Sequence, residues 1–113
     1  TVPMAEKKQE EIKQCDFKKP SLFFAKDLYF GIKGEDVLAL QQFLNGCKSF
    51  QLAENDFGAP GKETNYFGPL TEIALKKFQD AYAEKILKPL NLKKATGYFG
   101  YSTRKFLNAF PDF

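Results

Sequence analysis

The first segment with a helical period of apolar residues follows Gly34. Its stripe is formed by Val37, Leu40 and Leu44, which fall on one helical face. Two acidic residues stand in the first turn, where the helix dipole favours them, and an Asn-Gly pair supplies a stop signal. The pattern predicts a helix over residues 35–45.

Two later stretches have the same period. One begins at Pro69, a residue favoured at the first helical position, and its apolar face continues until Pro89, which predicts a single helix between them. The other follows Gly100 and carries Phe106, Leu107 and Phe110 towards the C-terminus. The predicted fold is therefore all-α: a small three-helix bundle with a long loop and an additional N-terminal arm or helix.

The remaining segments lack a sustained period. Residues 1–19 are polar and charged, and we interpret them as an arm that is either a short helix or a linker to a neighbouring domain, ahead of a domain over residues 20–113. An apolar stretch at 22–30 is expected to lie as a strap across the core. Residues 48–65 are predicted to form one long loop, with a helical turn near 50–54.

The sharpest feature is an internal repeat. The motif Tyr-Phe-Gly-x-x-Thr occurs at 66–71 and again 32 positions later at 98–103. Two copies predict two similar units packed as a pair rather than a solenoid. We expect Phe67 and Phe99 to fill the core, the glycines to permit a tight turn and close helix packing, and the threonine hydroxyls to satisfy free backbone groups of the first helical turn.

Composition restricts the classes of function. The 113 residues include thirteen Phe and five Tyr but no Trp, which suits a compact helical core. The net charge of +3 is small and dispersed, and Arg104 is the sole arginine, so a nucleic-acid surface is not expected. No apolar run is long enough to span a membrane. The absence of His removes the usual zinc ligands and the ordinary catalytic triad, so we expect no metal, no cofactor and no enzyme activity.

Two motifs in succession resemble a known family. Gly-x-Asp-Val-x-x-Leu-Gln-x-x-Leu at 34–44 is followed by Tyr-Phe-Gly-x-x-Thr-x-x-Ala-Leu-x-x-Phe-Gln at 66–79. This series resembles the bacterial peptidoglycan-binding domain found beside cell-wall hydrolases, over about residues 28–79. The resemblance implies a three-helix bundle that binds the wall without catalysis. The long linker before Phe67 and the second unit at 96–108 appear as additions to the usual domain.

A bound glycopeptide would need aromatic faces for its sugars and polar groups for its peptide. The candidates, chosen for chemistry and closeness to the repeat and the long loop, are Tyr66, Tyr98, Tyr101, Asn65, Asp56 and Lys62. Gln41 and Gln79 either form hydrogen bonds across the helix pair or face the ligand, and we favour the first.

The resemblance also points to an extracytoplasmic setting, at the cell wall or cell surface. Disulfides persist there, and Cys15 and Cys47 are the only cysteines, so we expect them to form a disulfide, with two buried thiols as the alternative.

The leading hypothesis is a non-catalytic module that anchors a larger protein on peptidoglycan or another cell-wall glycopeptide. The alternative is a structural subunit of a surface assembly or filament, whose partners would be neighbouring domains or identical subunits. Catalysis by Asp56, Glu63 or Glu72 is the weakest hypothesis, because the sequence shows no environment that would separate the pKa values of an acid and a base.

Overall fold

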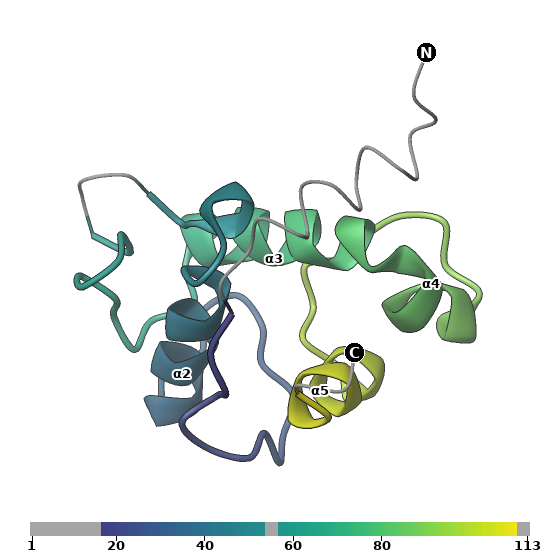
Figure 1. The fold of residues 1–113 in the computed structure, drawn as a ribbon, viewed down its shortest axis with the longest axis horizontal. Helices are drawn as coiled ribbons and strands as arrows, with labels where there is room; N and C mark the ends of the chain where they lie inside the picture. The colour runs from purple at the N-terminus through teal and green to yellow at the C-terminus, as the bar shows by residue number, and fades with distance from the viewer. Residues whose placement is uncertain (1–16, 54–56, 111–113) are drawn as a thin grey trace.

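The computed structural model describes residues 17–53 and 57–110, and the regular elements in these ranges are all helical (Figure 1). The predicted all-α fold is confirmed. In chain order the elements are α2 (Glu35–Leu44), the 3-10 helix η1 (Lys48–Phe50), α3 (Pro69–Ala81), α4 (Ala83–Ile86), the 3-10 helix η2 (Lys88–Leu90) and α5 (Tyr101–Asn108). In Figure 1, α2 lies near the start of α3, whereas α4 follows its end.

The first and last predicted helices form where the sequence places them. Helix α2 has Glu35 and Asp36 in its first turn and buries Val37, Leu40 and Leu44, which is the stripe read from the sequence. Helix α5 begins directly after Gly100 and buries two apolar side chains of the predicted face, Phe106 and Leu107.

The single helix predicted between Pro69 and Pro89 is wrong. Helix α3 ends at Ala81, and Tyr82 leaves the helical conformation with φ −110° and ψ 37°. The chain then forms α4, which buries Ile86, and η2. The break turns Ile86 towards α5, where its carbonyl oxygen accepts a hydrogen bond from the Ser102 hydroxyl at 2.7 Å. Tertiary packing thus overrides a helical period that continues unbroken in the sequence.

Aromatic rings fill the space between the helices. The ring of Phe78 on α3 meets Phe43 of α2 and Phe50 of η1 edge to face, with centroids 5.8 and 5.5 Å apart. Phe17 stacks on Phe43 at 4.6 Å. Edge-to-face and stacked pairs add to the burial energy of each ring, so this cluster is a strong contribution to the core.

The segment predicted as a strap connects the two Tyr-Phe-Gly motifs. Leu28 exchanges two backbone hydrogen bonds with Phe99, and Gly31 donates its N–H to the carbonyl oxygen of Phe67 at 2.8 Å. At its start, the backbone of Phe24 is held by the Asn108 side chain, which donates one hydrogen bond and accepts another. In Figure 1 this dark blue segment runs between α5 and α2. The strap prediction is confirmed.

The long loop is organised by the residue that follows α2. The side chain of Asn45 donates to the carbonyl oxygen of Gly58 and to the Glu63 carboxylate, at 2.8 and 2.9 Å, and accepts from the N–H of Leu52 at 3.1 Å. One buried amide thereby fixes both halves of the loop. Its helical turn is η1, which lies slightly earlier than the predicted turn at 50–54.

Candidate functional site

The side chain of Gln41 on α2 holds the first Tyr-Phe-Gly motif. Its amide nitrogen donates to the carbonyl oxygen of Tyr66 at 2.8 Å and to the hydroxyl of Thr71 at 3.0 Å. Its amide oxygen accepts from the N–H of Thr64 at 2.7 Å. We call this set of contacts the Gln41 network. It joins α2, the end of the long loop and the first turn of α3.

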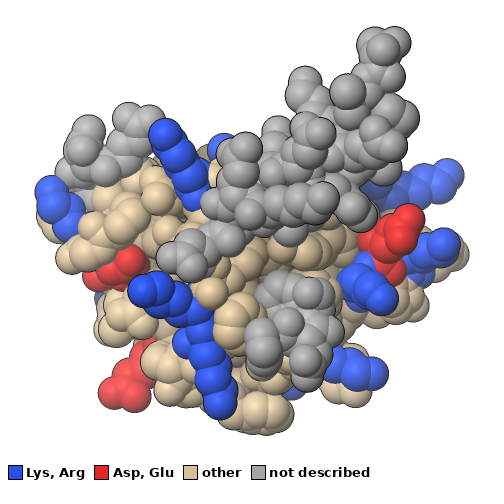
Figure 2. Space-filling model, viewed as in Figure 1, with Lys and Arg blue, Asp and Glu red and all other residues tan. Residues whose placement is uncertain are grey.

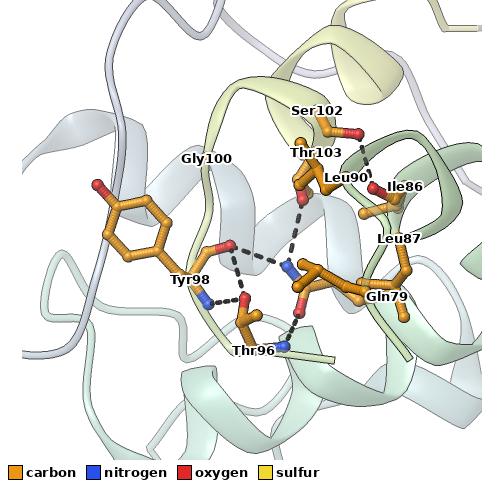
Figure 3. Close-up of a pocket in the computed structure, with 10 residues that line it drawn as sticks. Gln79, Ile86, Leu87, Leu90, Thr96, Tyr98, Gly100, Ser102 and Thr103 are labelled. Atoms are coloured by element: carbon orange, nitrogen blue, oxygen red, sulfur yellow. Dashed lines mark hydrogen bonds between the residues drawn. The ribbon is translucent and has the colours of Figure 1, made fainter. Parts of the chain in front are cut away.

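The side chain of Gln79 on α3 does the same for the second motif (Figure 3). Its amide nitrogen donates to the carbonyl oxygen of Tyr98 at 2.9 Å and to the hydroxyl of Thr103 at 3.2 Å. Its amide oxygen accepts from the N–H groups of Thr96 and Gly97, at 3.2 and 2.9 Å. This Gln79 network joins α3, the loop before the motif and the first turn of α5.

The two networks match atom for atom at their shared positions, and both glutamines are buried. The expectation that Gln41 and Gln79 form internal hydrogen bonds is confirmed. The role expected for the threonines is corrected: the hydroxyls of Thr71 and Thr103 accept from the glutamine amides, and neither helix has a side-chain cap.

The motif glycine is needed for space rather than for an unusual turn. Gly68 has φ −106°, which any residue can adopt. A Cβ atom at this position would lie 2.9 Å from the ring of Tyr66, which folds back over the glycine. At Gly100 the corresponding distance to the ring of Tyr98 is 3.2 Å. The close helix packing expected at these glycines is therefore wrong: the group that lies against each glycine is the ring of the tyrosine two residues earlier.

A pocket of about 260 Å³ opens beside the Gln41 network. We call it the Tyr66 pocket. Its lining residues from the long loop, the motif and the flanking helices are Gln41, Leu52, Phe57, Gly58, Thr64, Tyr66, Gly68, Pro69, Leu70 and Thr71. Phe57 and Leu70 are large apolar residues that remain 76% and 44% exposed. The polar atoms of Gln41 are already used internally, so the pocket offers mainly apolar surface.

A second pocket, of about 230 Å³, opens beside the Gln79 network (Figure 3). We call it the Tyr98 pocket. It is lined by Gln79, Ile86, Leu87, Leu90, Leu92, Thr96, Tyr98, Gly100, Ser102 and Thr103. Leu90 and Leu92 are 51% and 38% exposed. Both pockets are smaller than the roughly 300–1,000 Å³ typical of sites that enclose a whole small molecule, so each fits a side group of a larger ligand.

The predicted site residues divide between the two motifs. Tyr66 lines the Tyr66 pocket, and the ammonium group of Lys33 lies 5.9 Å from its ring centroid. Lys62 and Asn65 are exposed in the loop before this tyrosine, and Lys62 lines a neighbouring hollow with Phe57. Asp56 lies outside the described residues.

At the second motif the tyrosine ring is already engaged. Tyr98 stacks on Tyr29 at 5.8 Å, and its hydroxyl donates to the Asp27 carboxylate at 2.8 Å. This hydrogen bond raises the pKa of Tyr98, because ionisation would remove the donated proton. Figure 3 shows its ring pointing away from Gln79. Tyr101 is exposed and lies outside the pocket lining, 5.5 Å from the guanidinium of Arg104.

Charge is distributed rather than concentrated. Figure 2 shows Lys and Arg side chains spread over the visible face, with few acidic groups between them. The one arginine, Arg104, is paired with Asp27 at 3.0 Å. Within residues 17–53 and 57–110, no three His, Cys, Asp or Glu side chains come together as a metal site would require. In the same ranges no helix has the length and apolar character to cross a membrane.

A scan against protein-family models matches residues 33–107 to the family described as "Putative peptidoglycan binding domain". The match covers well over half of the chain. The chain belongs to this peptidoglycan-binding family. No curated protein and no solved structure matched the chain in the corresponding searches.

The range matched by the family model includes the second Tyr-Phe-Gly unit. The resemblance read from the sequence ended near Gln79 and treated the second unit, residues 96–108, as an addition beyond the usual domain. The matched range runs to residue 107. Both glutamine networks and both pockets therefore lie within this peptidoglycan-binding domain.

Sequence reasoning missed the apolar residues at the pocket edges. Phe57 lies in a loop without periodicity, and Leu90 and Leu92 follow Pro89, the expected end of the second helix, in a stretch to which the pattern assigns no role. Their position in the sequence is the signal that could have found them. Phe57 precedes the first Tyr-Phe-Gly motif, Leu90 and Leu92 precede the second, and all three are apolar residues with polar neighbours.

Proposed function

We propose that this domain is a non-catalytic module that attaches a larger protein to peptidoglycan outside the cytoplasm. The observation that carries the proposal is the family match over residues 33–107, which includes both motifs and the pockets beside them. Membership supports peptidoglycan as the partner. The anchoring role and the extracytoplasmic location are the finer steps proposed here.

The Tyr66 pocket is the proposed contact site. Peptidoglycan carries N-acetyl, lactyl and alanine methyl groups, and an apolar hollow of about 260 Å³ fits a group of this size. Phe57 and Tyr66 offer exposed ring surface for the faces of the sugars. Lys62 and Asn65, exposed nearby, supply a cation for a peptide carboxylate and an amide for its backbone.

A binding role without catalysis is supported by the state of the buried polar groups. In each network the glutamine amide is committed to structural hydrogen bonds with the motif and the next helix. The chain has no His to act as a base near neutral pH. The proposed Cys15–Cys47 disulfide belongs to the same extracytoplasmic setting. Cys47 is buried in the core, and Cys15 lies outside the described residues.

The experiment compares two matched double variants in their binding to purified, insoluble peptidoglycan sacculi. Phe57→Ser with Leu70→Ser removes the exposed apolar edge of the Tyr66 pocket. Phe23→Ser with Phe30→Ser removes two exposed rings of the strap that line neither the Tyr66 nor the Tyr98 pocket. If each of the two apolar contacts contributes about 1 kcal/mol to the free energy of binding, the first variant should bind roughly 30-fold more weakly.

The control variant should bind as the unchanged chain does. Both melting temperatures are measured, so that loss of binding is separated from loss of folding. Equal binding by a folded pocket variant and by the control would refute the Tyr66 pocket as the contact site.

A further inference from the structure

The Tyr66 and Tyr98 pockets occupy equivalent places in the two halves of the domain. Each lies beside a buried glutamine that binds the carbonyl oxygen of the motif tyrosine and the hydroxyl of the motif threonine. Five lining positions correspond at the 32-residue offset: 64 and 96, 66 and 98, 68 and 100, 70 and 102, and 71 and 103. The volumes, about 260 and 230 Å³, also agree.

The apolar edges of the two pockets come from unrelated sequences, each in the segment that precedes a Tyr-Phe-Gly motif. The segment before the first motif supplies Leu52 and Phe57, and the segment before the second supplies Leu90 and Leu92. Neither segment repeats the other in sequence, yet the first leaves Phe57 exposed at the mouth of its pocket and the second leaves Leu90 and Leu92 exposed. Exposed apolar groups beside a pocket mark binding sites more often than isolated ones do.

We propose that the Tyr98 pocket is a second peptidoglycan-binding site, so that one domain binds two glycopeptide units of the wall at once. The inference rests on the proposed function of the Tyr66 pocket. Its ligand is the same class of molecule: an N-acetylated, alanine-bearing glycopeptide with free carboxylates. A methyl-bearing group enters the hollow between Leu90 and Leu92.

Charge favours this ligand at the second site. Exposed Lys88, Lys93 and Lys94 flank the two leucines along the chain. The nearest carboxylates come from α3: Asp80 accepts the N–H of Ala95, and Glu72 lies against Gly97, away from the two leucines along the chain. The cations suit the carboxylates of a wall peptide. By contrast, the segment that edges the Tyr66 pocket includes Glu63, whose carboxylate is bound by Asn45 and Gly61.

The positions of the pockets suit simultaneous contact with a polymer. One lies at the start of α3, at Pro69–Thr71, and the other lies at its end, at Gln79. A helical rise of 1.5 Å per residue places these points roughly 15 Å apart along the α3 axis. Two weak sites on one rigid helix raise the overall affinity for a polymer without any change in either site.

The test is a titration of the full chain with a soluble disaccharide-tetrapeptide released from the wall by a muramidase, followed by amide chemical shifts in NMR. Three proteins are compared: the unchanged chain, Phe57→Ser with Leu70→Ser, and Leu90→Ser with Leu92→Ser. The dispersion of each spectrum shows that the variant is folded.

The expected result is two independent groups of shifted amides, one near Gly58 and Thr64 and one near Thr96 and Ser102. Each double variant should lose only its own group, and each should bind sacculi at least tenfold more weakly because bivalent attachment is lost. Shifts confined to the Tyr66 pocket would overturn the second site and leave the proposed function intact. Shifts confined to the Tyr98 pocket would overturn the two-site inference and would assign the contact site to the Tyr98 pocket in place of the Tyr66 pocket. No shift in either pocket, with no binding to sacculi, would overturn both.

Discussion

Replacing Gln79 by Met removes the Gln79 network while keeping an unbranched side chain of similar size. The substitution leaves little cavity, so the change in stability reports the hydrogen bonds. The amide makes four of them, to Thr96, Gly97, Tyr98 and Thr103, and the glutamine is 1% exposed.

The loss of stability in Gln79→Met depends on which hydrogen-bond partners of Gln79 are buried away from water. Gly97 and Thr103 are buried, so the N–H of Gly97 and the hydroxyl of Thr103 each lose a hydrogen-bond partner that water does not replace. A buried polar group left unsatisfied costs about 1–3 kcal/mol. Thr96 and Tyr98 are exposed residues, so water replaces part of what is lost there. The free energy of unfolding should therefore fall by about 2–4 kcal/mol, which corresponds to roughly 10–25 °C in melting temperature for a domain of this size.

Urea unfolding followed by far-ultraviolet circular dichroism measures this change. Gln42→Met is the matched control, because Gln42 lies next to Gln41 on α2 but is exposed. It should alter the free energy of unfolding by less than about 0.5 kcal/mol. A Gln79→Met protein as stable as this control would refute the view that the network holds the second motif in place.

Three further predictions concern the core, alkaline pH and the cysteines. Phe67→Ala and Phe99→Ala should each lower the free energy of unfolding by about 3–5 kcal/mol, measured by urea unfolding, because both rings are fully buried; a loss below about 1 kcal/mol would contradict their core role. Burial raises the pKa of Tyr82 to about 12 from 10.0. The unfolded chain therefore ionises first, and stability should fall as pH rises from about 10 to 12, less steeply in Tyr82→Phe; equal slopes would contradict this cause. A Cys15–Cys47 disulfide closes a loop of about 30 residues, worth on the order of 3 kcal/mol, and alkylation with mass measurement of the natively exported protein should find no free thiol without reductant.

The sequence was sufficient for the elements that rest on local signals. Helix α2 was predictable because its apolar period, acidic first turn and Asn-Gly stop agree. The glutamines were correctly assigned to internal hydrogen bonds, although their partners were not identified. Those partners lie 17 to 30 positions away, and only the folded chain brings them together.

The break at Tyr82 and the pockets were not predictable for a physical reason. The apolar period runs through Tyr82 to Leu87, so nothing local distinguishes a continuous helix from one that turns towards α5. The edges of both pockets come from loops whose conformation depends on distant contacts, such as that of Asn45 with Gly58. The sequence alone suggests which residues could line a site, but only the folded chain shows which of these residues lie together.

Sedimentation with purified sacculi shows whether this domain binds peptidoglycan. Chitin, which has the N-acetylglucosamine units but no peptide, is the control polymer. We predict saturable pelleting with sacculi, much weaker pelleting with chitin, and none without polymer. A folded domain that stays in the supernatant at every concentration of sacculi would contradict peptidoglycan binding, and one that pellets equally well without any polymer would instead favour a self-assembling structural subunit.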